Sequence, residues 1–186
     1  GFPQMFDTDS QAEGLYRFVN NDHVDSAGVL AGHVAASLVR AKQEGVALVV
    51  QDTTELDYSG EVPRKGLGRL GGSDSGYLAH VSLLVSADGE RVPLGVAALE
   101  HFSRTGQKKQ KQGSKARRSD PTRESTRWQR QLAHVEELRG DRFEAIHLMD
   151  REGDIYDLVA YAVANEARFV IRAAQDRSIE DDDCAR

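Results

Sequence analysis

Two short apolar segments, each leading to an aspartate, constrain the fold of this chain most strongly. Val46–Val50 is continuous and rich in β-branched residues, which is typical of a strand buried on both faces. Ala145–Met149 is equally short and apolar. Asp52 and Asp150 stand at the C-terminal ends of these two segments. Functional groups of α/β sheets collect at the carboxyl ends of the strands, so the pattern predicts two carboxylates at one sheet edge.

The segments around these strands predict the rest of the fold. Apolar residues at helical spacing indicate two helices within residues 11–44, the second capped by Asp25 or Ser26. Alternating apolar residues at Tyr77, Ala79, Val81, Leu83 and Val85 lead into Asp88-Gly89, which predicts a hairpin whose second strand lies within Arg91–Phe102. A helix from Thr122 to Gly140, a helix spanning Ile155 to Val163 and a strand at Phe169–Ile171 complete the order.

After the leading helices, the expected order is strand, strand, strand, helix, strand, helix, strand. A hairpin followed by right-handed helical crossovers gives a mixed sheet with flanking helices. This element order resembles that of the ribonuclease H-like fold. The fold class we expect is therefore α/β, a ribonuclease H-like mixed sheet preceded by a short helical segment.

Composition excludes several function classes. With 186 residues, of which 39% are hydrophobic, the chain has about the length of one domain. Its one cysteine, Cys184, excludes a disulfide framework and argues against a thiolate zinc site. No apolar run approaches the roughly 18 residues that span a bilayer, and the N-terminal residues lack a signal pattern. We expect a cytoplasmic protein with no membrane partner.

Basic charge is concentrated in one segment, although the net charge is -6. Ten Lys or Arg residues lie between Arg104 and Arg130, against only Asp120 and Glu124. Six of them are candidate phosphate contacts: Lys108, Lys109, Lys111, Lys115, Arg117 and Arg118. A solvated linker is the alternative interpretation, because Gly, Ser and Gln are frequent there.

Paired carboxylates at a sheet edge are suited to Mg²⁺. This ion takes oxygen ligands, keeps several waters and is typically held by one or two carboxylates together with substrate phosphates. Mn²⁺ is a plausible substitute. The alternative interpretation of Asp150 is structural, because an Asp after a strand often caps the next helix, here one starting near Asp154.

Several multi-residue motifs indicate which protein family the sequence resembles. Asp150-Arg-Glu-Gly-Asp-Ile-Tyr156 resembles the D-R-E-A-D-I-Y signature of bacterial cut-and-paste transposases, the insertion-sequence-4-like group of the DDE class. Gln51-Asp-Thr-Thr-Glu-Leu-Asp-Tyr58 is similar to the motif around the first catalytic Asp of that group. Five further segments match in the same order: Tyr16–Asn21, Gly66–Gly68, His80–Leu84, Arg123–Trp128 and Arg168–Arg172. Ordered motifs across nearly the whole chain are far more specific than any one alone.

The resemblance implies roles for these residues. Asp52 and Asp150 are then the first two acids of a metal-binding DDE triad, and Arg151, Glu152 and Asp154 belong to the supporting motif. Gly153 stands where the family usually has Ala. The third acid is a Glu within a Y-x-x-R-x-x-x-E motif further downstream, and nothing in this chain matches it. The implied partners are double-stranded DNA, as transposon ends and target, and a second copy of the protein in a homodimer.

The resemblance also implies a domain organisation. Residues 1–45 correspond to a helical connector from an N-terminal DNA-binding domain, residues 46–175 to part of the catalytic core, and residues 176–186 to the start of a β-rich insertion. The chain starts without Met and ends in an acidic run, so we expect a central fragment of a longer protein. The resemblance implies that this protein is bacterial, cytoplasmic and nucleoid-associated. We expect that this fragment does not transpose or cleave DNA alone.

Other interpretations stay open. The chain could be a transposase remnant that binds DNA or transposase subunits without chemistry, or another two-carboxylate nuclease on the same fold. Thr53 and Thr54 could orient Asp52 or bind phosphate, although Thr after a strand also commonly caps a turn. Trp128 could stack on a flipped base, but its helical spacing with Leu132 favours a core position. The six histidines are scattered and form no pair at metal-binding spacing.

Overall fold

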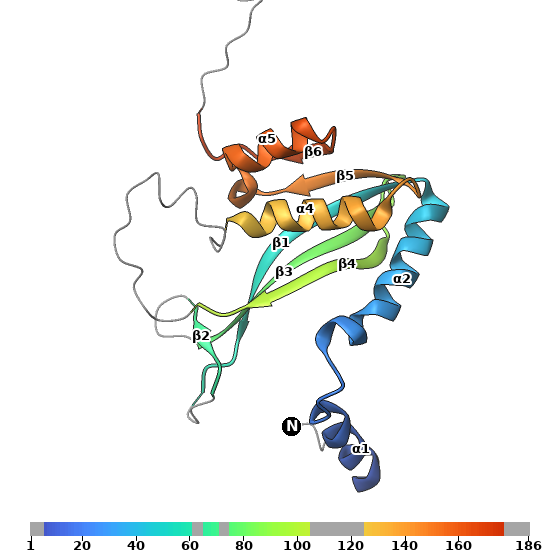
Figure 1. Ribbon diagram of the computed structural model, residues 1–186, viewed down its shortest axis with the longest axis vertical. Coiled ribbons are helices and arrows are strands. Elements are labelled where there is room, and N and C mark those ends of the chain that lie inside the picture. The colour runs from blue at the N-terminus through green and yellow to red at the C-terminus, as the bar shows by residue number, and fades with distance from the viewer. Residues whose placement is uncertain (1–5, 61–64, 71–74, 105–124, 177–186) are drawn as a thin grey trace, which may run out of the picture.

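A computed structural model describes residues 6–60, 65–70, 75–104 and 125–176 of the chain. Four α-helices, one 3₁₀ turn and six strands follow one another in these residues (Figure 1). In chain order they are α1 (Asp9–Val19), α2 (Ser26–Glu44), β1 (Val46–Asp57), β2 (Gly68–Arg69), β3 (Ser75–Ser86), β4 (Pro93–Phe102), α4 (Thr126–Arg139), β5 (Glu144–Met149), η2 (Arg151–Gly153), α5 (Tyr156–Ala164) and β6 (Arg168–Ile171).

All six strands form one mixed sheet with β1 near its centre. Strand β1 pairs antiparallel with β3 and parallel with β5, while β3 pairs antiparallel with β4 and β5 pairs parallel with β6. The long strands therefore lie in the order β4-β3-β1-β5-β6. This is the strand order of the ribonuclease H-like fold, so the expected fold class is confirmed. The two-residue β2, which pairs with β3, was not expected.

Helices α2 and α4 pack on the same face of the sheet (Figure 1). The main core cluster joins Leu38 of α2 and Val135 of α4 to Ala47 and Val49 of β1. The neighbouring side chains of β1, Leu48 and Val50, point to the opposite face and are only half-buried. Strand β1 is therefore buried on one face and not on both, which corrects the expectation from its continuous apolar sequence.

The alternating apolar residues that the sequence marks in β3 lie on the face of the sheet that the helices cover less. Three residues between the expected apolar positions are fully buried: His80, Ser82 and Leu84. Leu84 pairs with Val49, which places this set on the helix-covered face of the sheet. His80 and Ser82 thus occupy fully buried positions of β3. A sequence pattern based on apolar residues does not predict buried polar side chains.

A close approach between α2 and β4 fixes the position of α2. Gly95 has φ of 126°, and a Cβ atom there would lie 2.1 Å from Oγ of Ser37. The Arg40 side chain crosses the same contact, because its Nε donates a hydrogen bond of 2.5 Å to the carbonyl of Leu94. Helix α2 begins at its expected cap, since Oδ1 of Asp25 accepts a hydrogen bond from the backbone N–H of Gly28.

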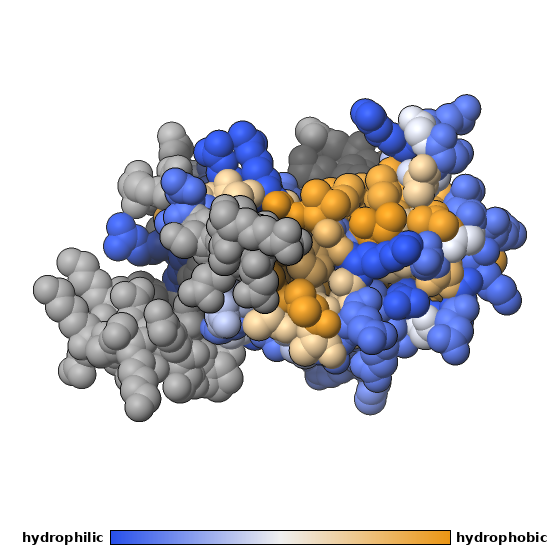
Figure 2. All heavy atoms as spheres, turned by 90° about the horizontal axis from the view of Figure 1, so that it is seen from above, coloured by the Kyte–Doolittle hydropathy of each residue, from blue (hydrophilic) through white to orange (hydrophobic). Residues whose placement is uncertain are grey.

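The two ends of the described chain have exposed apolar side chains. Helix α1 lies away from the sheet and has no buried residue (Figure 1). Viewed from the α5 end, apolar residues gather over the middle of the surface (Figure 2), and Val163 of α5 and Val170 of β6 are both exposed. Within the described residues, no helix has the length and apolar character needed to cross a membrane.

Candidate functional site

The two candidate carboxylates lie where the parallel pairing of β1 and β5 ends. Gln51 and Met149 are the last partners of this pairing, and Asp52 and Asp150 each follow by one residue. Neighbouring strands are about 4.8 Å apart, so this register brings the backbones of the two aspartates close together at the end of the pairing. The sequence predicted that Asp52 follows the strand. Strand β1 instead continues to Asp57, so Asp52 lies within it.

Asp52 projects from the face that α2 and α4 leave uncovered. Its side chain is exposed, and its Oδ1 accepts a hydrogen bond of 2.7 Å from the backbone N–H of Thr53. Thr54, two residues further along the strand, is exposed on the same face. In the described part of the chain, the hydrogen bond to the Asp52 carboxylate is accepted by Oδ1.

Asp150 caps a short 3₁₀ turn. Its Oδ1 accepts a hydrogen bond of 2.8 Å from the backbone N–H of Glu152, while α5 begins only at Tyr156. The capping interpretation of Asp150 therefore holds for η2 and not for the following α-helix. Since capping uses Oδ1 and the residue is exposed, the remaining carboxylate oxygen is accessible to a ligand.

The donor set fits a hard divalent cation. Both side chains supply carboxylate oxygens, which Mg²⁺ prefers, and both are exposed, as a site shared with phosphate and water requires. Among the described residues, no three His, Cys, Asp or Glu side chains form a group that could hold a metal ion. A metal at this edge would therefore have two carboxylates from the described residues.

His80 of β3 is buried on the covered face of the sheet and contacts β1 next to Asp52. His80 is the cross-strand partner of Thr53, and its Nδ1 lies 2.9 Å from the Thr53 hydroxyl. Burial lowers the pKa of His80 to about 4, the charges of Arg127 and Arg130 also lower it, and a hydrogen bond with the backbone of Asp52 opposes the shift. His80 is therefore neutral at neutral pH. Its Nε2 is buried without a hydrogen-bond partner among the described residues, an arrangement that typically costs about 1–3 kcal/mol.

Helix α4 holds His80 in place. Trp128 lies edge-on to the His80 ring, with centroids 4.4 Å apart and an angle of 70° between the planes. Nε2 of Gln131 donates a hydrogen bond of 2.7 Å to the His80 carbonyl, and Oε1 of Gln131 accepts one from the Ser82 hydroxyl. Trp128 is almost completely buried, so its expected place in the core is confirmed.

The same turn of α4 contacts the Asp150 turn. Arg127 is buried, and its guanidinium forms an ion pair of 3.3 Å with Glu152 and lies 5.0 Å from the ring centre of Phe102. The backbone N–H of Glu152 is the donor to Asp150. Two consecutive helix residues, Arg127 and Trp128, therefore reach the surroundings of the two candidate carboxylates.

The remaining residues of the expected supporting motif have separate positions. Oδ2 of Asp154 accepts hydrogen bonds of 2.7 and 3.0 Å from the backbone N–H groups of Ala174 and Gln175, which ties the chain after β6 to this turn. Arg151 is exposed. A Cβ atom on Gly153 would lie 2.8 Å from Cβ of Met149, so the alanine typical of the resembled motif would require a movement of the turn.

A second polar network crosses the core beside the first. His147 is fully buried, and its ring nitrogens lie 3.1 Å from Nε2 of Gln51 and 2.9 Å from Oε1 of Glu136. Although burial opposes the shift, hydrogen bonds from His147 and Arg139 lower the pKa of Glu136 to about 2. This network joins α4 to β1 one residue before Asp52.

Sequence reasoning did not single out His80, Gln131 or Arg127 as site residues. All three are buried polar side chains. His80 lies inside the matched segment His80–Leu84 and Arg127 inside Arg123–Trp128, so polar residues within these motifs were the available indication. The six candidate DNA-contacting residues, Lys108 to Arg118, lie outside the described residues.

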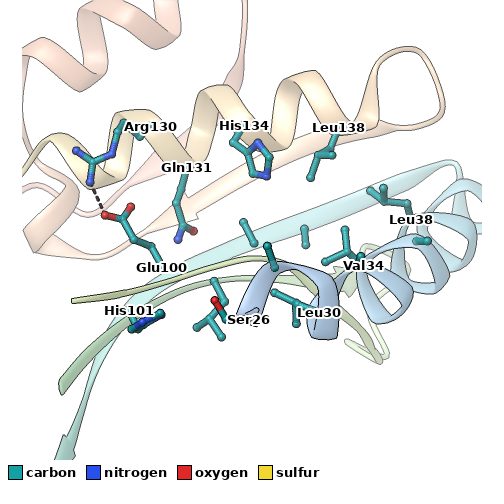
Figure 3. A pocket seen from close by; sticks show the side chains of 16 residues that line it. Ser26, Leu30, Val34, Leu38, Glu100, His101, Arg130, Gln131, His134 and Leu138 are labelled. Carbon is teal, nitrogen blue, oxygen red and sulfur yellow. Dashed lines mark hydrogen bonds and ion pairs between the residues drawn. The ribbon is translucent and has the colours of Figure 1, made fainter. Parts of the chain in front are cut away.

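A groove of about 600 Å³ lies elsewhere, between α2, β4 and α4 (Figure 3). Apolar residues such as Leu30, Val34 and Leu138 line most of it, and the ion pair of Arg130 with Glu100, at 2.5 Å, closes one end. Neither candidate carboxylate lines this groove. Both carboxylates are instead exposed on the surface.

No family model matches the chain. A solved structure described as a pre-cleavage Mos1 transpososome is similar over 92% of this chain and 53% of the matched chain, with 11% sequence identity and a TM-score of 0.32. The chain thus spans about half the length of that protein. The ribonuclease H-like fold follows from the strand order and register of the sheet.

Proposed function

We propose that this chain is part of the catalytic core of a DDE transposase of the insertion-sequence-4-like group, in which Asp52 and Asp150 are two of the three acids that hold divalent metal for phosphoryl transfer on DNA. One observation carries the proposal. The two aspartates of the motifs Gln51–Tyr58 and Asp150–Tyr156, nearly 100 residues apart in sequence, follow the last register pair of two parallel strands.

The chemistry follows from the donor set. Bound Mg²⁺ or Mn²⁺ would neutralise the phosphate and stabilise the attacking and leaving oxygens of an in-line displacement. Asp52 and Asp150 would supply oxygen ligands, while backbone N–H groups hold one oxygen of each carboxylate in place. In the proposed reaction, water cleaves the strand at an element end, and the 3′-hydroxyl formed later attacks target DNA.

The proposed partners are double-stranded DNA and a second copy of the protein. Exposure of both carboxylates favours a large substrate, because a duplex can reach an open sheet edge without entering a pocket. The basic segment from Lys108 to Arg118 would contribute phosphate contacts to this interface.

Thermodynamic linkage between metal and DNA tests the proposal. If substrate phosphates complete the coordination of the metal, DNA must tighten metal binding and the metal must tighten DNA binding by the same factor. Calorimetric titration of Mn²⁺ with and without a short DNA duplex should show this coupling for the wild type. Asp52→Asn and Asp150→Asn should abolish it.

Asp141→Asn is the matched control, because Asp141 is also exposed but lies before β5, at the opposite end of that strand. It should retain the coupling. Metal binding that is unaffected by DNA, or DNA binding that is unaffected by both site substitutions, would contradict the proposed function and favour a remnant that binds DNA without chemistry.

A further inference from the structure

We infer that His80 is a positioning residue for Asp52, which it orients through the hydroxyl of Thr53. The inference rests on the proposed metal site and adds a role for a residue outside the recognised carboxylates. It starts from three adjoining contacts. Oδ1 of Asp52 accepts the N–H of Thr53 at 2.7 Å, the hydroxyl of Thr53 lies 2.9 Å from Nδ1 of His80, and the ring of His80 packs on Trp128.

The first contact defines where the Asp52 carboxylate points. A carboxylate hydrogen-bonded to the N–H of the next residue moves with that peptide group. Parallel pairing with β5 ends at Gln51, so β5 does not hold the peptide between Asp52 and Thr53. Antiparallel pairing with β3 continues through both residues and holds the strand on that side, and the Thr53 side chain adds an anchor on the covered face of the sheet.

The second contact provides that anchor. Thr53 and His80 are direct cross-strand partners, and side chains of such pairs lie on the same face. His80 is fully buried and held from two directions by α4, through the Trp128 ring and through Gln131, which donates to the His80 carbonyl. A rigid ring under Thr53 restricts its χ1 angle and, with it, the peptide that contacts Asp52.

A stabilising role alone does not account for histidine at this position. Among the described residues, Nε2 of His80 has no hydrogen-bond partner, so the ring loses one buried polar interaction. A leucine would pack against Trp128 without an unpartnered atom. The imidazole adds a contact with the Thr53 hydroxyl and a hydrogen bond with the backbone of Asp52, and both lead to the candidate metal ligand.

Metal affinity combined with a double-mutant cycle tests this role. The dissociation constant for Mn²⁺ is measured by electron paramagnetic resonance on the whole chain, and stability is measured by urea unfolding. His80→Leu and Thr53→Val each remove one side of the contact, and each should weaken Mn²⁺ binding about tenfold, the lower range for groups that orient metal ligands. The double variant should bind Mn²⁺ no more weakly than His80→Leu alone, because that change already breaks the contact with Thr53.

Conservative variants and a control separate positioning from stability. His80→Asn places an amide where Nδ1 lies, and Thr53→Ser keeps the hydroxyl, so both should restore affinity close to the wild type. Leu84→Val, in the same strand and equally buried, should lower the urea midpoint without changing Mn²⁺ affinity. Should His80→Leu not fold, the comparison of Thr53→Val with Thr53→Ser decides the question.

The two possible failures are distinguishable. If Asp52→Asn leaves the Mn²⁺ affinity of the wild type unchanged, the proposed metal site is wrong. If Asp52→Asn abolishes binding while His80→Leu and Thr53→Val bind Mn²⁺ as the wild type does, the metal site holds and the positioning role of His80 is wrong.

Discussion

Gln51 and Met149 are the last register partners of the parallel strands β1 and β5, and Asp52 and Asp150 each follow them by one residue. This register brings the motifs Gln51–Tyr58 and Asp150–Tyr156, which are far apart in sequence, next to each other in the fold. Gln51 and Met149 are both buried, whereas the aspartates that follow are exposed. In both strands, the exposed carboxylate therefore comes directly after a buried residue at the same register position.

The exposed carboxylates should contribute little to stability. Asn can still accept the local backbone hydrogen bond, and removal of one negative charge reduces any repulsion between neighbouring carboxylates. We predict that Asp52→Asn and Asp150→Asn change the free energy of unfolding by no more than about 0.5 kcal/mol, as is usual at exposed positions. Urea unfolding measures this change, and a loss of several kcal/mol in either variant would show that the aspartate is structural.

Much of the fold could be predicted from the sequence, because apolar periodicity and turn residues report local structure. The run Ala145–Met149, the Asp88-Gly89 hairpin and the Asp25 cap all correspond to observed elements. The two-residue β2 could not be predicted, since its pairing with β3 depends on tertiary contacts and not on its own sequence.

The candidate site was predictable in part. The motifs identified Asp52 and Asp150, whereas His80 went unrecognised because a buried polar residue interrupts an apolar pattern and has no spacing of its own. Its role depends on contacts with Thr53 and Trp128, which are 27 and 48 positions away in the sequence and meet only in the folded sheet.

Acid should destabilise the protein through His80. Its pKa is about 4 in the folded chain and 6.5 in its ordinary state, so the unfolded chain binds more protons between these values. The contribution of His80 is fully present above pH 6.5 and is lost as the pH falls to about 4, by up to about 1.4 kcal/mol per pH unit.

His80→Asn has no titrating ring and should reduce this slope. Urea unfolding of both proteins between pH 7 and pH 4 provides the measurement. Identical pH profiles of the wild type and His80→Asn would show that His80 is not held neutral by its surroundings.

Glu136 should stabilise the core network in its charged form. Its pKa of about 2 lies below the ordinary value of 4.5, so its contribution is present above pH 4.5 and lost as the pH falls toward 2. Glu136→Gln removes the charge that faces Arg139 and the buried His147, and we predict a loss of about 1–3 kcal/mol at pH 7. Unfolding free energies at pH 7 test this, and an unchanged value would indicate that the network adds nothing to stability.

Gly95 should tolerate no side chain. A Cβ atom there would clash with Oγ of Ser37, and the φ of 126° is strained for any other residue. We predict that Gly95→Ala lowers the free energy of unfolding by about 2 kcal/mol or more, by displacing α2 from β4. Gly89→Ala is a matched control, because Gly89 also has a positive φ but faces open space, so it should cost less. Equal losses in the two variants would mean that the contact with Ser37 is unimportant.

The shared metal site is tested most directly by locating Mn²⁺ through its paramagnetic effect on backbone amides. In a ¹H–¹⁵N spectrum with substoichiometric Mn²⁺, the signals of Thr53 and Glu152 should broaden first, because their N–H groups donate to the two carboxylates. Asp52→Asn should abolish the broadening at both positions, since one ion bridges the two strands. If Thr53 and Glu152 keep full intensity while other acidic segments broaden, Asp52 and Asp150 do not form a metal site.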